Sequence, residues 1–151
     1  MTSLLLATCT YQEFRADMAG APVRSTVGYP RFSLTYTLAG HARLIAPQRT
    51  MLNLPKDAFM LSYRRLLDRA GVDAIRQELI NIVGAGNRAV LLCFDRLDRP
   101  TKDGGENWCH RTMFAAWWQE KTGEEVPELG AAPSARPRVQ LPQLVPESLF
   151  D

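Results

Sequence analysis

Two continuous apolar runs along the chain predict the central strands of a sheet. The first covers residues 3–8 and leads into Cys9 and Thr10, and the second covers residues 88–95. Strands without polar alternation are typical of parallel sheets that are buried on both faces. Residues 23–29 could add a short third strand.

The middle of the chain has helical periodicity. Apolar side chains recur at helical spacing from Pro55 to Gly71, where glycine is a common C-terminal stop. A second helix with an apolar face follows and ends at Gly84, and a third is predicted over residues 109–122. The segment 31–54 is broken by prolines and has no regular period, so no element is assigned to it.

Strand, helices, strand and helix is the element order of an α/β fold. We therefore expect a small, mostly parallel, Rossmann-like sheet flanked by helices in one domain, residues 1–129. Residues 125–129 could form a short strand. Its place would be at the edge of the sheet, because only edge strands tolerate the proline that it contains. Prolines recur every four to five residues beyond Gly130, so residues 130–151 are predicted to be an extended, proline-rich tail.

The composition indicates a soluble globular protein. The 151 residues are 46% hydrophobic and 23% charged, which excludes a disordered or fibrous chain. The net charge of +2 is too small to favour a nucleic-acid partner or a membrane surface. The first apolar run lacks the basic residues that precede the core of a signal peptide. Three cysteines without a CxxC pair do not predict a secreted disulfide framework, so we expect a cytoplasmic protein.

Ligand sites of parallel α/β sheets lie at the carboxyl ends of strands and the N-termini of the following helices. The third helix starts with Cys109, His110 and Arg111. The helix dipole and neighbouring cations favour a thiolate there, so Cys109 could be a nucleophile and His110 could move protons. The planar fork of Arg111 suits a phosphate or carboxylate. In the plainer interpretation, Cys109 is a small buried side chain and the next two residues are a solvated helix start.

Cys93 and Asp95 lie on one face of the second strand, because side chains alternate along a strand. Asp95 could be a general base or orient His110, and Cys93 could contribute to ligand binding or be a core cysteine. A zinc site formed by Cys9, Cys93, Cys109 and His110 is conceivable. Metal ligands, however, usually come in pairs spaced as CxxC or HxxxH, and these four residues contain no such pair. No metal site is therefore expected, and the sequence does not identify a cofactor.

The loop after the first strand offers a further group of candidates. Thr10 and Tyr11 would sit at the mouth of the same crevice, where a hydroxyl and an aromatic ring could hold a sugar or a base. Arg15 adds a cation for an anionic ligand. The alternative is an ordinary loop without a ligand.

The strand motif at residues 90–95, which reads VLLCFD, and the later Cys109-His110-Arg111 together resemble the domain-of-unknown-function 488 family. The hallmark of that family is a strand close to LLCFE followed by Cys-His-Arg at a helix start. The likeness extends over residues 3–129, and the compact form with a tail resembles members from bacteria and their phages. The resemblance implies a functional Cys-His-Arg motif and, by analogy with nucleotide-binding α/β domains, a nucleotide or nucleoside ligand. Asp95 replaces the family's glutamate, which shortens the reach of a catalytic base there.

Three functional hypotheses follow. In the first, the chain is an enzyme that acts on a small anionic, nucleotide- or nucleoside-like substrate, with Cys109, His110 and Asp95 as catalytic residues. In the second, the same pocket binds or sequesters such a ligand without turnover. In the third, the proline-rich tail docks on another protein or on a second copy of the chain.

Overall fold

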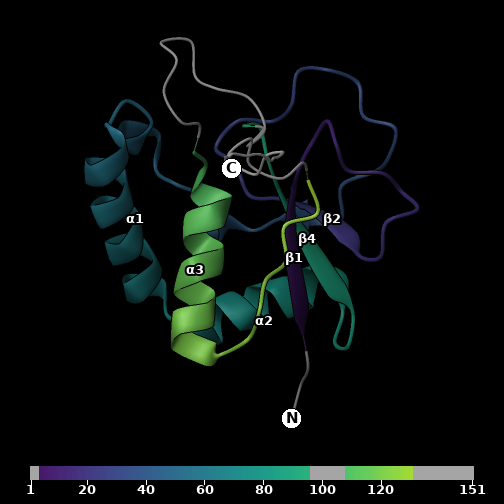
Figure 1. The fold of residues 1–151 in the computed structure, drawn as a ribbon. Helices are drawn as coiled ribbons and strands as arrows, with labels where there is room; N and C mark the ends of the chain where they lie inside the picture. Colours follow the sequence, from purple (N-terminus) through teal and green to yellow (C-terminus); the bar gives the residue numbers. More distant parts are fainter. Residues whose placement is uncertain (1–3, 96–107, 131–151) are drawn as a thin grey trace, which may run out of the picture.

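A parallel sheet forms the middle of the molecule (Figure 1). The computed structural model describes residues 4–95 and 108–130. Its strands are β1 (Leu5–Thr10), β2 (Ala21–Arg24), β3 (Gly40–His41) and β4 (Arg88–Cys93), in the order β1-β4-β2-β3. All three strand pairs are parallel, which confirms the predicted α/β class.

β1 and β4 form the longest pair of the sheet. Leu5 lies opposite Arg88 and Thr10 opposite Cys93, so both strands end at the same edge. β2 is shorter and begins earlier than the strand predicted over residues 23–29. After Arg24 the chain leaves the sheet. The Ser25 hydroxyl donates to the Leu92 carbonyl of β4, and the Thr26 hydroxyl donates to the Gly28 carbonyl.

The three α-helices of the described residues pack against one face of this sheet. They are α1 (Lys56–Ala70), α2 (Val72–Val83) and α3 (His110–Thr122), each within about a residue or two of its predicted bounds. α1 passes directly into α2 through Gly71, whose φ of 85° lies in the region that favours glycine. Buried side chains from the strands and all three helices form one core; they include Leu6, Leu91, Tyr63, Leu79, Trp117 and Trp118.

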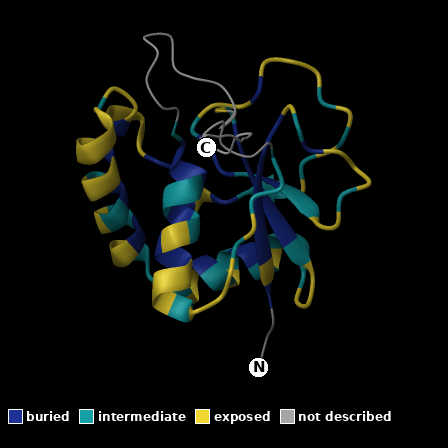
Figure 2. Cartoon of the chain, viewed as in Figure 1, coloured by how far each residue is buried: buried dark blue, intermediate teal, exposed yellow. Residues whose placement is uncertain are grey.

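The opposite face of the sheet is covered without α-helices among the described residues. Ala7, Cys9, Val90 and Leu92 form its buried surface. Most of the covering side chains come from the irregular segments 11–18 and 34–38, and Phe94 and Leu129 add to them. Those of the two segments are Tyr11, Phe14, Met18, Leu34, Tyr36 and Leu38. Figure 2 shows the resulting pattern, with buried strands between the helices on one side and irregular loops on the other, and with exposed outer surfaces on the helices.

The segment 31–54 contains short elements that periodicity could not reveal. They are β3 and two turns of 3-10 helix, Arg43–Ile45 and Arg49–Met51. Ile45 and Met51 anchor these turns in the core beneath the helices.

The predicted edge strand at residues 125–129 reduces to a single parallel bridge between Thr8 and Glu128. The Thr8 N–H donates to the Pro127 carbonyl over 2.9 Å, and the Leu129 N–H donates to the Thr8 carbonyl over 2.7 Å. The predicted tail lies outside the described residues from position 131 on. None of the helices in the described part of the chain is long and apolar enough to cross a membrane.

Candidate functional site

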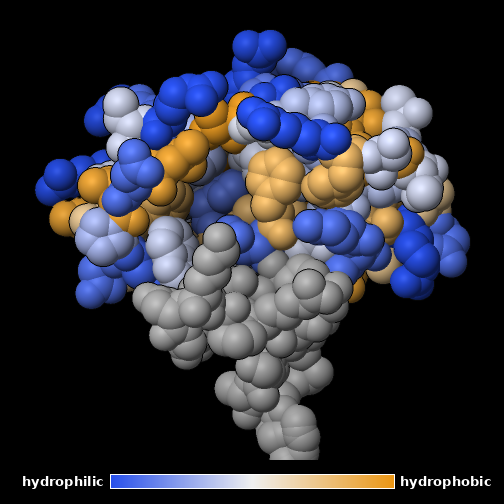
Figure 3. All heavy atoms as spheres, turned by 90° about the horizontal axis from the view of Figure 1, so that it is seen from above, coloured by the Kyte–Doolittle hydropathy of each residue, from blue (hydrophilic) through white to orange (hydrophobic). Residues whose placement is uncertain are grey.

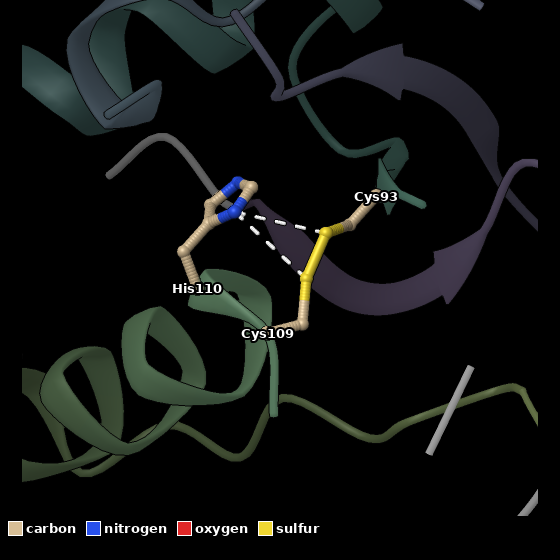
Figure 4. Close-up of side chains that lie close together, drawn as sticks. All are labelled: Cys93, Cys109 and His110. Atoms are coloured by element: carbon tan, nitrogen blue, oxygen red, sulfur yellow. Dashed lines mark hydrogen bonds between the residues drawn. A yellow bond between two sulfur atoms is a disulfide. The ribbon is translucent and has the colours of Figure 1, made fainter. Parts of the chain in front are cut away.

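A pair of bonded cysteines joins the carboxyl end of β4 to the start of α3. Cys93 is the last residue of β4, Cys109 directly precedes α3, and their sulfur atoms form a disulfide (Figure 4). The sequence did not predict this bond, because the two cysteines are 16 residues apart and lie in no familiar motif. They meet only because the fold brings the strand end and the helix start together, as expected for sites in parallel sheets.

The imidazole of His110 faces both sulfur atoms (Figure 4). Its Nδ1 lies 3.6 Å from the Cys93 sulfur and 3.8 Å from the Cys109 sulfur. On the other side of the ring, Nε2 lies 2.8 Å from the Ser25 carbonyl oxygen. A carbonyl can only accept a hydrogen bond, so Nε2 carries the hydrogen and Nδ1 presents a lone pair to the sulfurs.

Burial keeps His110 neutral at ordinary pH. Loss of water lowers the pKa of His110 to about 4, and the positive charge of Arg111 adds to the lowering. The hydrogen bond to Ser25 opposes these effects only in part. The edge of the Tyr63 ring packs on the imidazole, with ring centroids 5.6 Å apart, and fixes its orientation.

A cavity of about 290 Å³ reaches this cluster from the surface. Its wall combines apolar residues with the polar side chains at the end of the sheet: Pro47, Leu52, Phe59, Trp108, Asp95, Cys109 and His110. The face that carries the strand ends is hollowed near its middle, between hydrophobic and hydrophilic residues (Figure 3). Three predicted catalytic residues, Cys109, His110 and Asp95, therefore line one space. Partial desolvation raises the pKa of Asp95, against the opposing effect of Arg111.

Arg111 lies at the same helix start but points into the protein. Its side chain is fully buried and forms a fork with Glu128, with N–O distances of 2.9 and 3.2 Å. A third bond of 2.7 Å runs from Nη1 to the Asp95 carbonyl. These contacts join the start of α3 to the segments that contain Asp95 and Glu128. Ligand binding by Arg111 stays a prediction. Glu128 is not among the predicted site residues, because only the return of its segment to β1 brings it to α3.

The candidates of the first loop do not line the cavity. The hydroxyl of Thr10 donates a hydrogen bond of 2.8 Å to the Glu13 carboxylate, and the hydroxyl of Tyr11 lies within hydrogen-bond distance, 2.6 Å, of the Thr26 hydroxyl. Arg15 is exposed and pairs with Asp17. None of the three lines the cavity, although Thr10 lies opposite Cys93 in the sheet and the Tyr11 N–H donates to the Cys93 carbonyl over 3.0 Å.

The remaining cysteine, Cys9, is apart from the cluster. It is a free thiol, buried on the sheet face opposite the helices. Burial raises the pKa of Cys9 to about 11, so its thiolate is disfavoured.

No family model matches the chain, and neither curated proteins nor solved structures give a match. The resemblance to the domain-of-unknown-function 488 family therefore stays a prediction.

Proposed function

We propose that this protein is a thiol–disulfide redox protein whose Cys93–Cys109 pair cycles between disulfide and dithiol. One observation carries the proposal: the bonded pair lies beneath a cavity, with the unprotonated Nδ1 of His110 within 4 Å of both sulfurs. In a cytoplasmic protein such a pair would be expected to cycle, because disulfides of cytosolic proteins are usually transient, catalytic or redox-sensing.

The cavity determines which sulfur a reaction partner meets first. Cys109 contributes to the cavity wall, whereas Cys93 lies behind it at the end of β4. The partner is a small thiol or an exposed protein thiol. Its thiolate attacks the Cys109 sulfur, the S–S bond breaks, and Cys93 leaves with the electron pair and takes up a proton. A second partner thiol then displaces Cys109, so the disulfide and two partner thiols give two cysteine thiols and a partner disulfide.

His110 is placed to stabilise the dithiol form. In the disulfide neither sulfur carries a hydrogen, so neither can donate to the buried Nδ1. After reduction, a thiol of Cys93 or Cys109 can donate a hydrogen bond to this lone pair. A buried acceptor that gains a donor is stabilised by about 1 kcal/mol, which favours reduction of the pair.

The test is redox equilibration of the folded, full-length protein in glutathione buffers, followed by acid trapping, alkylation and mass spectrometry. We expect a reversible change of two thiols at Cys93 and Cys109, with Cys9 unchanged. Cys9→Ala is the matched control and should titrate as the parent does. A disulfide that stays closed in reduced glutathione and opens only in denaturant would overturn the proposal, because the bond would then be purely structural.

A second candidate function keeps the nucleotide- or nucleoside-like substrate predicted from the sequence. The rings of Phe59 and Trp108, with centroids 5.1 Å apart, form part of the cavity wall, and aromatic walls suit flat ligands. A thermal-shift screen of nucleosides and nucleotides tests this candidate. A stabilising ligand whose effect is lost in Trp108→Ala supports it, and mass spectrometry of the mixture then separates turnover from binding alone. A screen without a stabilising ligand counts against it.

A further inference from the structure

The disulfide and its histidine also form a potential set of metal ligands. The ligand atoms of Cys93, Cys109 and His110 all lie within 4.8 Å of one another, and all three residues are buried. Two thiolates and one imidazole are ligands that zinc-class cations prefer. This combination arises from two separate elements, which is why the sequence, with no close pair of ligands, predicted no metal site.

The imidazole is already oriented as a metal ligand. Histidines that bind metals usually donate their second ring N–H to a carbonyl or carboxylate, which fixes the tautomer and the ring plane. In this protein the Ser25 carbonyl accepts a hydrogen bond from the Nε2–H of His110, and the Ser25 hydroxyl donates a hydrogen bond of 2.7 Å to the Leu92 carbonyl. The lone pair of Nδ1 is thereby directed at the two sulfurs.

The distances also agree with a tetrahedral ion. Zinc–sulfur bonds of about 2.3 Å and zinc–nitrogen bonds of about 2.05 Å place a sulfur and a nitrogen about 3.6 Å apart at a tetrahedral angle. The distances from His110 Nδ1 to the sulfurs are 3.6 and 3.8 Å. Only the sulfur–sulfur separation must grow, to about 3.8 Å. The Cα atoms of the two cysteines are 7.3 Å apart, above the roughly 4.4–6.8 Å usual for disulfides, so the backbone leaves room for two separate thiolates.

We propose that the dithiol form of this protein binds one zinc-class divalent cation through the sulfurs of Cys93 and Cys109 and Nδ1 of His110. The proposal rests on the reducible disulfide proposed above. Binding converts two thiols into two thiolates and releases two protons, and the ion keeps its oxidation state. Because the charge of two thiolates balances that of the ion, the site suits a buried position. The cavity beside Cys109 and His110 can supply water to the fourth coordination position.

Disulfide and metal exclude each other at this site. Oxidation removes both thiolates and must release the ion, whereas a bound ion protects the thiols from oxidation. The protein would then hold a metal only under reducing conditions.

The test is a metal titration of the full-length protein after reduction with a phosphine and removal of the reductant without oxygen. Thiol counting first confirms three free thiols. We expect one equivalent of Co²⁺ to give thiolate-to-cobalt charge transfer and tetrahedral d–d absorption, and one equivalent of Zn²⁺ to abolish both. The oxidised protein should bind neither ion. Release of two protons per ion, read with a pH indicator, gives a second measurement on the unmutated chain.

Variants assign the ligands. Cys109→Ser should lose most of the charge-transfer band, and His110→Gln should weaken Co²⁺ binding at least tenfold, while Cys9→Ala should bind as the parent does. Confirmed thiols without a charge-transfer band or proton release overturn the metal site and leave the redox proposal standing. A band that survives in Cys109→Ser overturns the ligand set. A disulfide that does not open in the folded protein overturns both proposals.

Discussion

Replacing Arg111 by methionine should destabilise the fold by about 3 kcal/mol. The guanidinium is fully buried and holds Glu128 through two charge-assisted hydrogen bonds and the Asp95 carbonyl through a third. Methionine has a similar length, so it fills most of the space and leaves little cavity. The loss of stability therefore comes from the broken ion pair.

The size of the expected stability loss depends on the solvent contact and hydrogen bonds that Glu128 keeps after the substitution. Removing one partner of a buried ion pair costs roughly 3–5 kcal/mol, because the remaining charge is left without compensation. The Glu128 side chain is 21% exposed. It also keeps hydrogen bonds from the Thr8 hydroxyl and the Gly130 N–H. These contacts place the expected loss at the lower end of that range, near 3 kcal/mol.

Urea denaturation of the oxidised protein, followed by tryptophan fluorescence, measures this loss. Arg64→Met is the matched control, because its pair with Glu120 is exposed to solvent and should contribute little to stability. A double-mutant cycle of Arg111→Met with Glu128→Gln should give a coupling energy of roughly 1.5 kcal/mol or more. If Arg111→Met is as mild as the control and instead abolishes binding of an anionic ligand, the guanidinium serves the ligand and the structural reasoning fails.

The remaining predictions concern the cysteines and histidines. Reduction of the disulfide should lower the free energy of unfolding by about 3 kcal/mol, as expected for a loop of this length, and an unchanged urea midpoint would contradict this. The pKa of His110 is about 4 in the folded protein and 6.5 in the unfolded chain, so the unfolded chain takes up a proton first as the pH decreases. The free energy of unfolding should therefore fall below pH 6.5, by about 2 kcal/mol at pH 5. Stability curves of His110→Asn and His41→Asn check the source: both should flatten the slope, because burial lowers the pKa of both histidines, and His110→Asn should flatten it more. Iodoacetamide should leave Cys9 unmodified until the protein unfolds, as peptide mass spectrometry can show.

Local pattern determined which elements could be predicted. β1, β4 and the α-helices were predictable because an apolar run or a helical period marks each within its own residues. The short turns of 3-10 helix in segment 31–54 were not, because distant groups hold them. The Glu78 carboxylate accepts hydrogen bonds from the N–H groups of Arg43 and Leu44, and the Tyr63 hydroxyl donates to the Ile45 carbonyl. The sequence of residues 43–45 contains no pattern that indicates these distant partners.

The same distinction applies to the site. The proximity of Cys109, His110 and Asp95 was predictable because strand ends and helix starts lie together at one edge of a parallel sheet. The Cys93–Cys109 bond and the Arg111–Glu128 fork were not, since each depends on how a later segment returns to the sheet.

The unequal covering of the two sheet faces has a consequence for how the protein opens. Side chains from irregular segments shield one face, and such segments detach locally more readily than packed helices. Limited proteolysis should therefore nick segment 11–20 or 31–39 before any helix. The disulfide and His110 lie on the helical side, so a nicked chain should retain the redox cycling proposed above while losing the cover over Cys9.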